Sequence, residues 1–237
     1  MSRPRIVLVS GWAHPAETLQ PLADKLSDAL AATVLPASDD LVRVLQANAA
    51  PCLLLGWSLG GMKALEAALH FPGKVSGLVL VSATARFCRE QDYPCGVDRS
   101  EVRAMARALR QTPGDVLTRF METAARPVEE PAASIRSKVA DAMARGADRL
   151  KAGLAYLLDT DLRMALESLH QPVLLLHGRE DAIIPWQASQ HLANLLRNSR
   201  LVLLDGLGHD LPIRCPQPVA EQVIAFAQAL HESRPAQ

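Results

Sequence analysis

The 237-residue chain is 49% hydrophobic and 21% charged, which excludes an intrinsically disordered protein and allows a large buried core. This length suits one large domain, or a core that carries an inserted subdomain. With 25 basic and 25 acidic residues the formal net charge is zero, which argues against a protein that binds nucleic acid over its whole surface. We therefore expect no nucleic-acid partner, although composition alone does not exclude a local basic patch.

Four cysteines are scattered along the chain, at Cys52, Cys88, Cys95 and Cys215. They form no Cys-x-x-Cys pair and have no metal-ligand spacing, which is typical of reduced thiols in a cytosolic protein. No apolar stretch has the length of a transmembrane helix, and the run from Ile6 to Val9 is too short for a signal peptide. We therefore expect a cytoplasmic monomer without a metal, a cofactor or a membrane partner.

The first 85 residues alternate between apolar runs of strand length and segments with helical periodicity. Residues 5–10 are almost continuously apolar, as expected for a strand buried on both faces of a parallel sheet. Leucines at helical spacing follow between residues 18 and 30. Further strands are predicted at residues 32–36, 52–55 and 75–82, and further helices at residues 41–49 and 62–69. This alternation predicts an α/β, doubly wound parallel sheet.

The pattern changes from residue 86 to residue 165, where no buried strand is recognisable and charged residues are more frequent. Helices are predicted there at residues 100–110, 116–125, 132–144 and 148–158. Strands and helices alternate again in the last part of the chain, at residues 173–178, 186–196, 200–204 and 219–231. We interpret residues 86–165 as a helical cap inserted between two parts of an α/β core, residues 1–85 and 166–237.

A strand-turn-helix motif around Ser58 is the strongest chemical signal in the chain. Apolar residues of strand length lead into Gly56-Trp57-Ser58-Leu59-Gly60, and a helical segment follows. This is the Gly-x-Ser-x-Gly nucleophile elbow, in which the glycines allow a tight turn from strand to helix. The turn presents the serine hydroxyl above the sheet at the positive end of the helix. We predict Ser58 as a nucleophile.

A nucleophilic serine needs a base, and the base needs an acid that orients it. With this elbow the chain order is serine, acid, histidine, where the acid follows a late strand and the histidine follows the last strand. The turn after residues 173–178 offers Glu180 and Asp181; we favour Asp181 and keep Glu180 as the alternative. The loop at residues 206–210 places His209 after the last strand. We therefore predict His209 as the base.

Two other histidines are alternatives to His209 as the base. His14 lies near the predicted site but in the wrong chain order, and His177 ends a strand, where a structural role is the better interpretation. The remaining histidines lie on or beside predicted helices, where surface roles fit better.

An oxyanion hole needs two backbone N–H groups aimed at the developing negative charge. One is expected from Leu59, which follows the nucleophile, and the other from Trp12 in the loop after the first strand. The indoles of Trp12 and Trp57 would also provide flat apolar walls beside the serine. Core packing is the alternative role for both rings.

Basic residues recur along two consecutive helical stretches of the predicted cap: Arg136, Lys138, Arg145, Arg149 and Lys151. Asp141 and Asp148 interrupt the run. Such a run usually forms a solvated helix face, while the sharper alternative is a docking surface for an acidic partner.

Several of these motifs occur together in one known family. The chain resembles the pimeloyl-[acyl-carrier protein] methyl ester carboxylesterases of biotin synthesis, which are α/β-hydrolases. The segments that carry the resemblance are Gly11-Trp12, Gly56-Trp57-Ser58-Leu59-Gly60-Gly61, Val79-Leu80-Val81-Ser82-Ala83, Asp92-Tyr93-Pro94, Gly153-Leu154, Asp159-Thr160-Asp161-Leu162-Arg163, Leu176-His177-Gly178, Asp181, Ile184-Pro185 and Gly208-His209. The tryptophan before the serine, Asp-Tyr-Pro and Thr-Asp-Leu-Arg point to this family rather than to hydrolases in general.

The resemblance implies a cofactor-independent serine carboxylesterase with the α/β-hydrolase fold, a mostly parallel sheet flanked by helices with a helical cap. It implies the roles given above for Ser58, Asp181, His209, Trp12 and Leu59, with Trp57 lining the pocket. The implied substrate is a methyl ester at the end of a pimeloyl chain on acyl-carrier protein, an acidic partner that would dock on the cap. The implied docking residues are Arg145 and Arg149 first, then Arg136, Lys138 and Lys151.

Two alternatives stay open at this point. The first is a general short-chain carboxylesterase or thioesterase of the same fold, for which the basic face of the cap is only solvated surface. The second is a non-catalytic protein that keeps the hydrolase pocket as a receptor for a ligand. The intact set Ser58, Asp181 and His209 argues against the second.

Overall fold

A computed structural model of the chain describes residues 3–37 and 40–232. In this part of the chain, six parallel strands form one sheet in the order β2-β1-β3-β4-β5-β6. The strands are β1 (Arg5–Val9), β2 (Ala31–Leu35), β3 (Cys52–Trp57), β4 (Val75–Val81), β5 (Val173–Gly178) and β6 (Ser199–Leu204). The parallel α/β sheet predicted from the apolar runs is confirmed.

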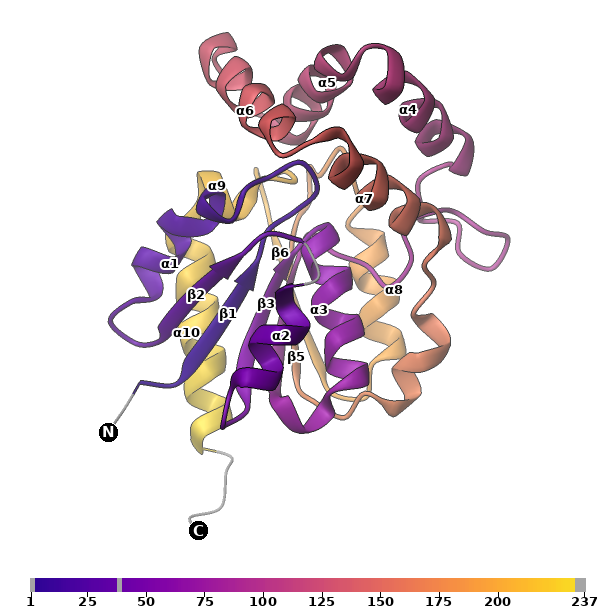
Figure 1. Ribbon diagram of the computed structural model, residues 1–237. Helices are drawn as coiled ribbons and strands as arrows, with labels where there is room; N and C mark the ends of the chain where they lie inside the picture. The colour runs from indigo at the N-terminus through magenta and orange to yellow at the C-terminus, as the bar shows by residue number, and fades with distance from the viewer. Residues whose placement is uncertain (1–2, 38–39, 233–237) are drawn as a thin grey trace.

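Helices cover both faces of the sheet, which explains why its central strands are apolar on both sides (Figure 1). One face carries α1 (Gln20–Leu26) and α10 (Pro216–Glu232), and the other carries α2 (Asp40–Ala47), α3 (Leu59–His70) and α8 (Gln187–Leu195). Successive side chains of a strand point to opposite faces. In β3, Leu54 accordingly packs on the α3 side, whereas Leu53 and Leu55 pack on the side of α1 and α10.

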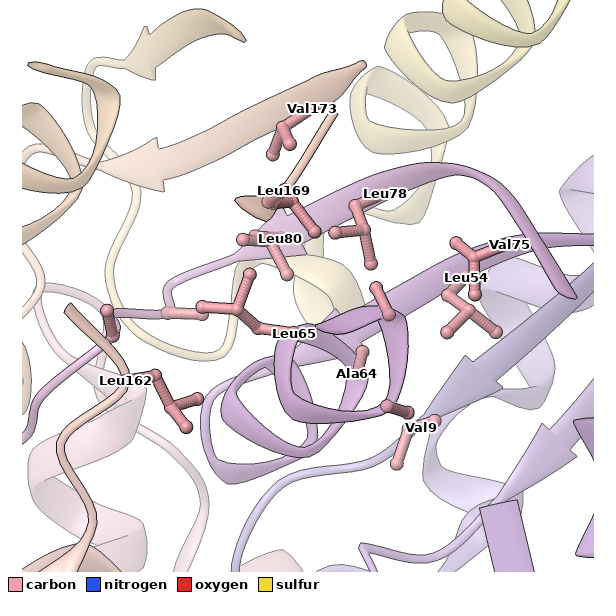
Figure 2. Close-up of a cluster of buried hydrophobic side chains, with 14 of the residues drawn as sticks. Val9, Leu54, Ala64, Leu65, Val75, Leu78, Leu80, Leu162, Leu169 and Val173 are labelled. Atoms are coloured by element: carbon pink, nitrogen blue, oxygen red, sulfur yellow. The ribbon is translucent and has the colours of Figure 1, made fainter. Parts of the chain in front are cut away.

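The apolar layer between the sheet and α3 positions the end of β3. Figure 2 shows Leu54, Leu78 and Leu80 of the sheet around Leu65 of α3, with Leu162 from a later segment at one edge. Leu54, Leu65, Leu78 and Leu80 are completely buried. Burying one such leucine contributes about 1.5–3 kcal/mol, so this layer holds α3 firmly against the strand that precedes it.

Helices α4 (Arg99–Gln111), α5 (Pro113–Ala125), α6 (Ala132–Ala144) and α7 (Ala147–Asp159) lie between β4 and β5 in the chain. They gather beyond one end of the sheet (Figure 1). The segments that lead into and out of this group run side by side, because Arg86 forms an antiparallel bridge with Asp161 and the Leu162 N–H donates to Ala85 O over 3.0 Å. Apolar side chains of α4 to α7 share one buried cluster with Trp12, Leu59 and Met62.

Some predicted elements differ at their ends. The helix predicted from residue 18 to 30 is a 3₁₀ turn, Ala16–Leu19, followed by α1, which stops at Leu26 because the chain turns there to reach β2. The helix after the serine begins directly at Leu59 rather than at residue 62. Short helices at Pro72–Lys74, Arg163–Ser168 and α9 (Leu211–Arg214) were not predicted. No helix within residues 3–37 and 40–232 is both long and apolar enough to cross a membrane.

Candidate active site

Ser58 stands alone between the end of β3 and the start of α3, as the elbow motif predicts. Its φ of 55° lies in the left-handed region, which is uncommon for a residue other than glycine. The Ser58 N–H donates to Val81 O over 2.9 Å, which anchors the turn to the neighbouring strand. The strained turn is therefore held by the sheet on one side and by α3 on the other.

The glycines of the elbow are required by close backbone contacts. A Cβ on Gly56 would lie 2.4 Å from Gly60 O, and a Cβ on Gly60 would lie 2.3 Å from Val9 O. Atoms cannot approach so closely without moving the backbone. The spacing of glycines around Ser58 therefore reflects the packing of α3 against the ends of β1 and β3.

His209 and Asp181 meet Ser58 from loops far along the chain. His209 Nε2 lies 3.0 Å from Ser58 Oγ, and His209 Nδ1 lies 2.8 Å from Asp181 Oδ2. His209 follows β6 and Asp181 follows β5, and both are buried. Glu180, the alternative acid, is exposed to solvent. The structure thus brings together the serine, histidine and aspartate favoured from the sequence.

The Asp181 carboxylate is held in its charged form although it is buried. Burial alone would raise its pKa, but the charge of His209 and hydrogen bonds from the histidines outweigh that effect and hold the pKa well below its usual range. The Ile183 and Ile184 backbone N–H groups each donate to Oδ1 over 2.8 Å. Oδ2 is consequently the oxygen left to face His209.

The two residues predicted to supply oxyanion N–H groups, Trp12 and Leu59, lie at the ends of neighbouring strands of the sheet. Leu59 is the first residue of α3, and Trp12 lies in the loop after β1. Within the described residues, neither N–H donates a hydrogen bond to the protein. The Trp12 indole is fixed from the cap side, because its Nε1 donates to Leu150 O of α7 over 2.9 Å.

Trp57 does not line a substrate pocket as the resemblance implied. Its indole is completely buried, because the alternation along β3 directs Trp57 to the same face as Leu53 and Leu55. There Trp57 Nε1 donates to His209 O over 2.8 Å. Trp57 therefore supports the backbone that carries His209 instead of contacting a ligand.

A cavity of about 450 Å³ opens beside the Trp12 loop, between α3 and α7. Its walls are largely apolar, and three basic side chains are part of its lining. The lining residues are Gly11, Trp12, Ala13, His14, Pro36, Ala37, Leu59, Lys63, Arg145, Arg149, Leu150, Ala152, Gly153 and Tyr156. Ser58, Asp181 and His209 are not part of this lining; the cavity reaches the reactive group through Leu59, which directly follows Ser58 in the chain.

The five basic residues predicted for docking divide into two groups. Arg136, Arg149 and Lys151 are exposed, and Arg149 lies on the cavity with Arg145, which contacts Glu17 over 3.3 Å. Lys138 is half-buried and lies 2.9 Å from Glu130, which also binds Arg214, so its charge is already balanced within the chain.

Three residues that surround Trp12, Trp57 or the cavity were not predicted to do so from the sequence. His14 lies on the cavity with its ring 4.7 Å from that of Trp57, Phe120 of α5 contacts the Trp12 ring edge-on, and Gly153 of α7 packs on Trp12. His14 had a usable signal, because it lies two residues after Trp12, the tryptophan predicted to supply an oxyanion N–H group. Phe120 and Gly153 had none, because their contacts depend on how the cap is folded onto the core.

No group of three or more histidine, cysteine, aspartate or glutamate side chains within residues 3–37 and 40–232 is placed to hold a metal ion. All four cysteines are free. The chemistry that the site offers directly is that of a serine hydroxyl next to a histidine, with backbone donors nearby.

Comparison with known proteins gives sequence relatives over most of the chain. A family model described as "Serine aminopeptidase, S33" matches residues 38–213. Pimeloyl-[acyl-carrier protein] methyl ester esterases of Nitrosomonas europaea and Stenotrophomonas maltophilia are each 32% identical, over 87% of this chain and 88% and 86% of theirs. A biotin biosynthesis bifunctional protein of Cellvibrio japonicus is 31% identical over 97% of this chain and 49% of its own length.

Solved structures resemble the chain over nearly its whole length. An esterase from Exiguobacterium antarcticum has a TM-score of 0.85 at 22% identity, and a bromoperoxidase from Bacillus anthracis has 0.86 at 19% identity. Each match covers 96% of this chain and 92% of the other. At such identities the likeness shows the fold alone.

Proposed function

This chain is an esterase of the pimeloyl-[acyl-carrier protein] methyl ester esterase family within the α/β-hydrolases, and we propose that it demethylates a pimeloyl methyl ester on acyl-carrier protein in biotin synthesis. The observation that carries the reaction type is the hydrogen-bonded series Ser58, His209 and Asp181 beside a cavity with basic residues in its lining. The names of the sequence relatives support the substrate.

In the first half of the proposed reaction, Ser58 Oγ attacks the ester carbonyl while His209 Nε2 takes its proton over the 3.0 Å hydrogen bond. Asp181 holds the other ring N–H of His209 and stabilises the imidazolium that forms. The N–H groups of Trp12 and Leu59 donate to the carbonyl oxygen as it becomes negative. Methanol leaves with the proton from His209, and an acyl-enzyme on Ser58 remains.

In the second half, water replaces methanol. His209 removes a proton from the water as its oxygen attacks the acyl carbonyl, and the same N–H groups stabilise the second tetrahedral intermediate. Its collapse returns the proton to Ser58 Oγ and releases the free carboxylate at the end of the acyl chain. One ester and one water thus give one acid and one methanol, without a cofactor.

The acyl chain would lie in the cavity that α7 covers. Trp12, Leu59 and Leu150 provide apolar contacts, while Lys63, Arg145 and Arg149 contribute positive charge to the lining. The same cavity therefore offers apolar contacts to an acyl chain and positive charge to whatever carries it. A negatively charged carrier protein would be attracted to the side of the cavity where the basic residues lie. In this proposal α4 to α7 act as the cap, and Arg145 and Arg149 lead the docking set.

The test is mass spectrometry of methyl-pimeloyl carrier protein incubated with purified enzyme. Wild type is expected to remove one methyl group, Ser58→Ala none, and the double variant Arg145→Glu with Arg149→Glu to act at least about ten-fold more slowly. The matched control changes Arg197 and Arg200 to Glu, because both are exposed arginines next to or within β6 and far along the chain from the cap. That control should demethylate at the wild-type rate.

A general short-chain esterase is the second candidate, and one observation favours it. Arg145 contacts Glu17 and Lys151 contacts Asp148, so part of the positive charge on the cap is already balanced within the chain. For such an enzyme, wild type would cleave small esters and leave the carrier-bound methyl ester intact. That outcome would exclude the biotin-synthesis substrate while preserving the roles of Ser58, Asp181 and His209. Turnover by Ser58→Ala would exclude those roles as well.

A further inference from the structure

A second histidine contacts the acid of the active site. His177 lies at the end of β5 and is completely buried. Its Nε2 lies 2.9 Å from Ile184 O and 3.1 Å from Asp181 Oδ2, the same oxygen that faces His209. The proposed reaction uses only the contact of Asp181 with His209, so the contact with His177 has no assigned role.

The neighbours of His177 determine which ring nitrogen carries a proton. Ile184 O is a carbonyl oxygen, and the Asp181 carboxylate stays ionised, so both oxygens next to Nε2 can only accept. If Nε2 carried no hydrogen, its lone pair would be repelled by the lone pairs of Ile184 O at 2.9 Å and Asp181 Oδ2 at 3.1 Å. Nε2 therefore carries hydrogen: its N–H donates to Ile184 O, and Asp181 Oδ2 lies beside this hydrogen bond, 3.1 Å from Nε2.

The other nitrogen of the ring is held by α8. His177 Nδ1 lies 2.7 Å from Ser189 Oγ, and Ser189 Oγ lies 3.0 Å from Ala83 O. If the Ser189 hydroxyl donates to Ala83 O, Nδ1 must also carry hydrogen and the ring is charged; if it donates to Nδ1, the ring is neutral. In both arrangements Nε2–H donates to Ile184 O, with Asp181 Oδ2 3.1 Å from the same nitrogen. The direction of the contact is thus independent of the charge on His177.

We propose that His177 is a positioning residue of the active site: its Nε2–H keeps Asp181 Oδ2 in line with His209 Nδ1 and shares the negative charge of that oxygen. This role rests on the proposed function of Ser58, Asp181 and His209. Ser189 holds the His177 ring from behind, so that a buried series of polar contacts runs from α8 to the nucleophile. Because the Nε2–H group offsets part of the negative charge of Oδ2, loss of His177 should strengthen the pair that Asp181 forms with His209.

Other groups also face His209, and the experiment has to leave them unchanged. His14 from the loop after β1 and Asp210 from the same loop as His209 are both close enough for charge interactions with His209. Asp210 is itself bound by Arg214 over 2.8 Å. None of these three side chains is altered by a substitution at residue 177, so a change in pH dependence would report the contact with Asp181.

The test compares His177→Phe with His177→Gln on a small neutral ester, across pH. The phenyl ring keeps the shape and removes both nitrogens, whereas the glutamine amide restores an N–H donor near Asp181. For His177→Phe we expect kcat to fall about ten-fold with KM within two-fold, and the acid limb of the pH profile to move up by about half a pH unit. In His177→Gln the acid limb should return toward that of wild type.

A second readout needs no change at residue 177. In Ser58→Ala protein, nitrogen NMR of the histidine rings should show His177 Nε2 protonated throughout the pH range of activity. A bare Nε2, or a His177→Phe variant whose acid limb stays at the wild-type pH, would overturn the role of His177 while leaving the proposed function intact. Failure of wild type to cleave any ester would instead overturn the proposed function.

Discussion

His14 is a buried histidine that stays neutral next to the reacting groups. Burial and the nearby charges of Lys138, His209 and Arg145 lower its pKa from 6.5 to about 3. Within the described residues its Nε2 has no hydrogen-bond partner. In the proposed reaction His209 gains a positive charge, and a neutral His14 ring does not repel it.

The low pKa of His14 predicts a specific dependence of stability on pH. Between pH 6.5 and about 3 the unfolded chain binds a proton at His14 that the folded chain does not, so the free energy of unfolding falls as the pH falls. From pH 7 to pH 5 this residue should cost about 2 kcal/mol. Urea unfolding of wild type and His14→Leu at both pH values measures it. Between pH 7 and pH 5 the free energy of unfolding of His14→Leu should fall by about 2 kcal/mol less than that of wild type. Equal falls in the two proteins would contradict the prediction.

Asp181 and Glu180 are adjacent carboxylates with opposite surroundings. Asp181 is buried against His209, and Glu180 is exposed. Asp181→Asn should lower kcat on a small ester by about 10³–10⁴-fold, because an amide can impose the wrong tautomer on the base and does not stabilise its cation. Glu180→Gln is the matched control and should retain wild-type kcat. Circular dichroism of both variants shows whether the fold is kept, and a folded, active Asp181→Asn would exclude Asp181 as the acid.

At the scale of elements, an ion-pair cluster joins the two segments that connect the cap to the core. Arg86 binds Asp161 over 2.9 Å, and Arg163 binds both Asp161 and Asp92, at 2.8 and 2.9 Å. The Arg163 guanidinium also lies over the Tyr93 ring, 5.3 Å from its centre. Asp-Tyr-Pro and Thr-Asp-Leu-Arg, which are far apart in the sequence, thus belong to one structure at the base of the cap. These contacts tie together the two chain segments that connect α4–α7 to the sheet.

Helix α7 touches the loop after β1 at Gly153, and this contact predicts a second effect of the cap on activity. A Cβ at Gly153 would lie 2.4 Å from Trp12 Cδ1, so Gly153→Ala must displace α7 or the Trp12 indole, whose backbone N–H we propose as an oxyanion donor. We expect kcat to fall about ten-fold and the free energy of unfolding to fall by about 1–3 kcal/mol.

Gly114 of α5 provides the control, because nothing lies within 4 Å of the position its Cβ would take. Gly114→Ala should keep full activity and gain up to about 1 kcal/mol of stability. The measurements are kcat on a small ester and urea unfolding. Equal behaviour of the two alanine variants would contradict a close contact between α7 and Trp12.

At the scale of the whole molecule, charge is balanced overall but not in every place. The formal net charge is zero, yet Lys63, Arg145 and Arg149 all line the cavity next to the active site. An attraction confined to one side acts only on a partner that reaches that side, and salt screens it over a Debye length of about 10 Å at 0.1 M. Any steering of a charged partner should therefore depend on Lys63 of α3 and on Arg145 and Arg149 near and in α7, rather than on the net charge.

This uneven charge predicts a difference between substrates. As NaCl rises from about 0.05 to 0.5 M, kcat/KM for methyl-pimeloyl carrier protein should fall about ten-fold or more, whereas kcat/KM for a small neutral ester should change little. Steady-state kinetics on both substrates at matched pH decides it. A carrier-protein reaction indifferent to salt would argue against docking through these basic residues.

The parallel sheet and the three central residues were predictable from the sequence because their signals are local. Buried strands are continuously apolar. The glycines around Ser58 are required by a single tight turn. Asp181 and His209 each follow a late strand that can be recognised in the sequence. Chain order then selects His209 from the other histidines. The sequence thus determined the class of fold and the residues proposed to carry out the reaction.

Only the tertiary structure decided which side chains surround these three residues. Trp57 was predicted to line the pocket, but its indole donates to the His209 carbonyl. Lys138 forms an ion pair with Glu130, and His177 contacts Asp181. Each outcome depends on which side chain of another segment arrives at that place, and sequence spacing does not contain this information. The cap acts in the same way, since its contact with Trp12 forms between residues more than a hundred positions apart.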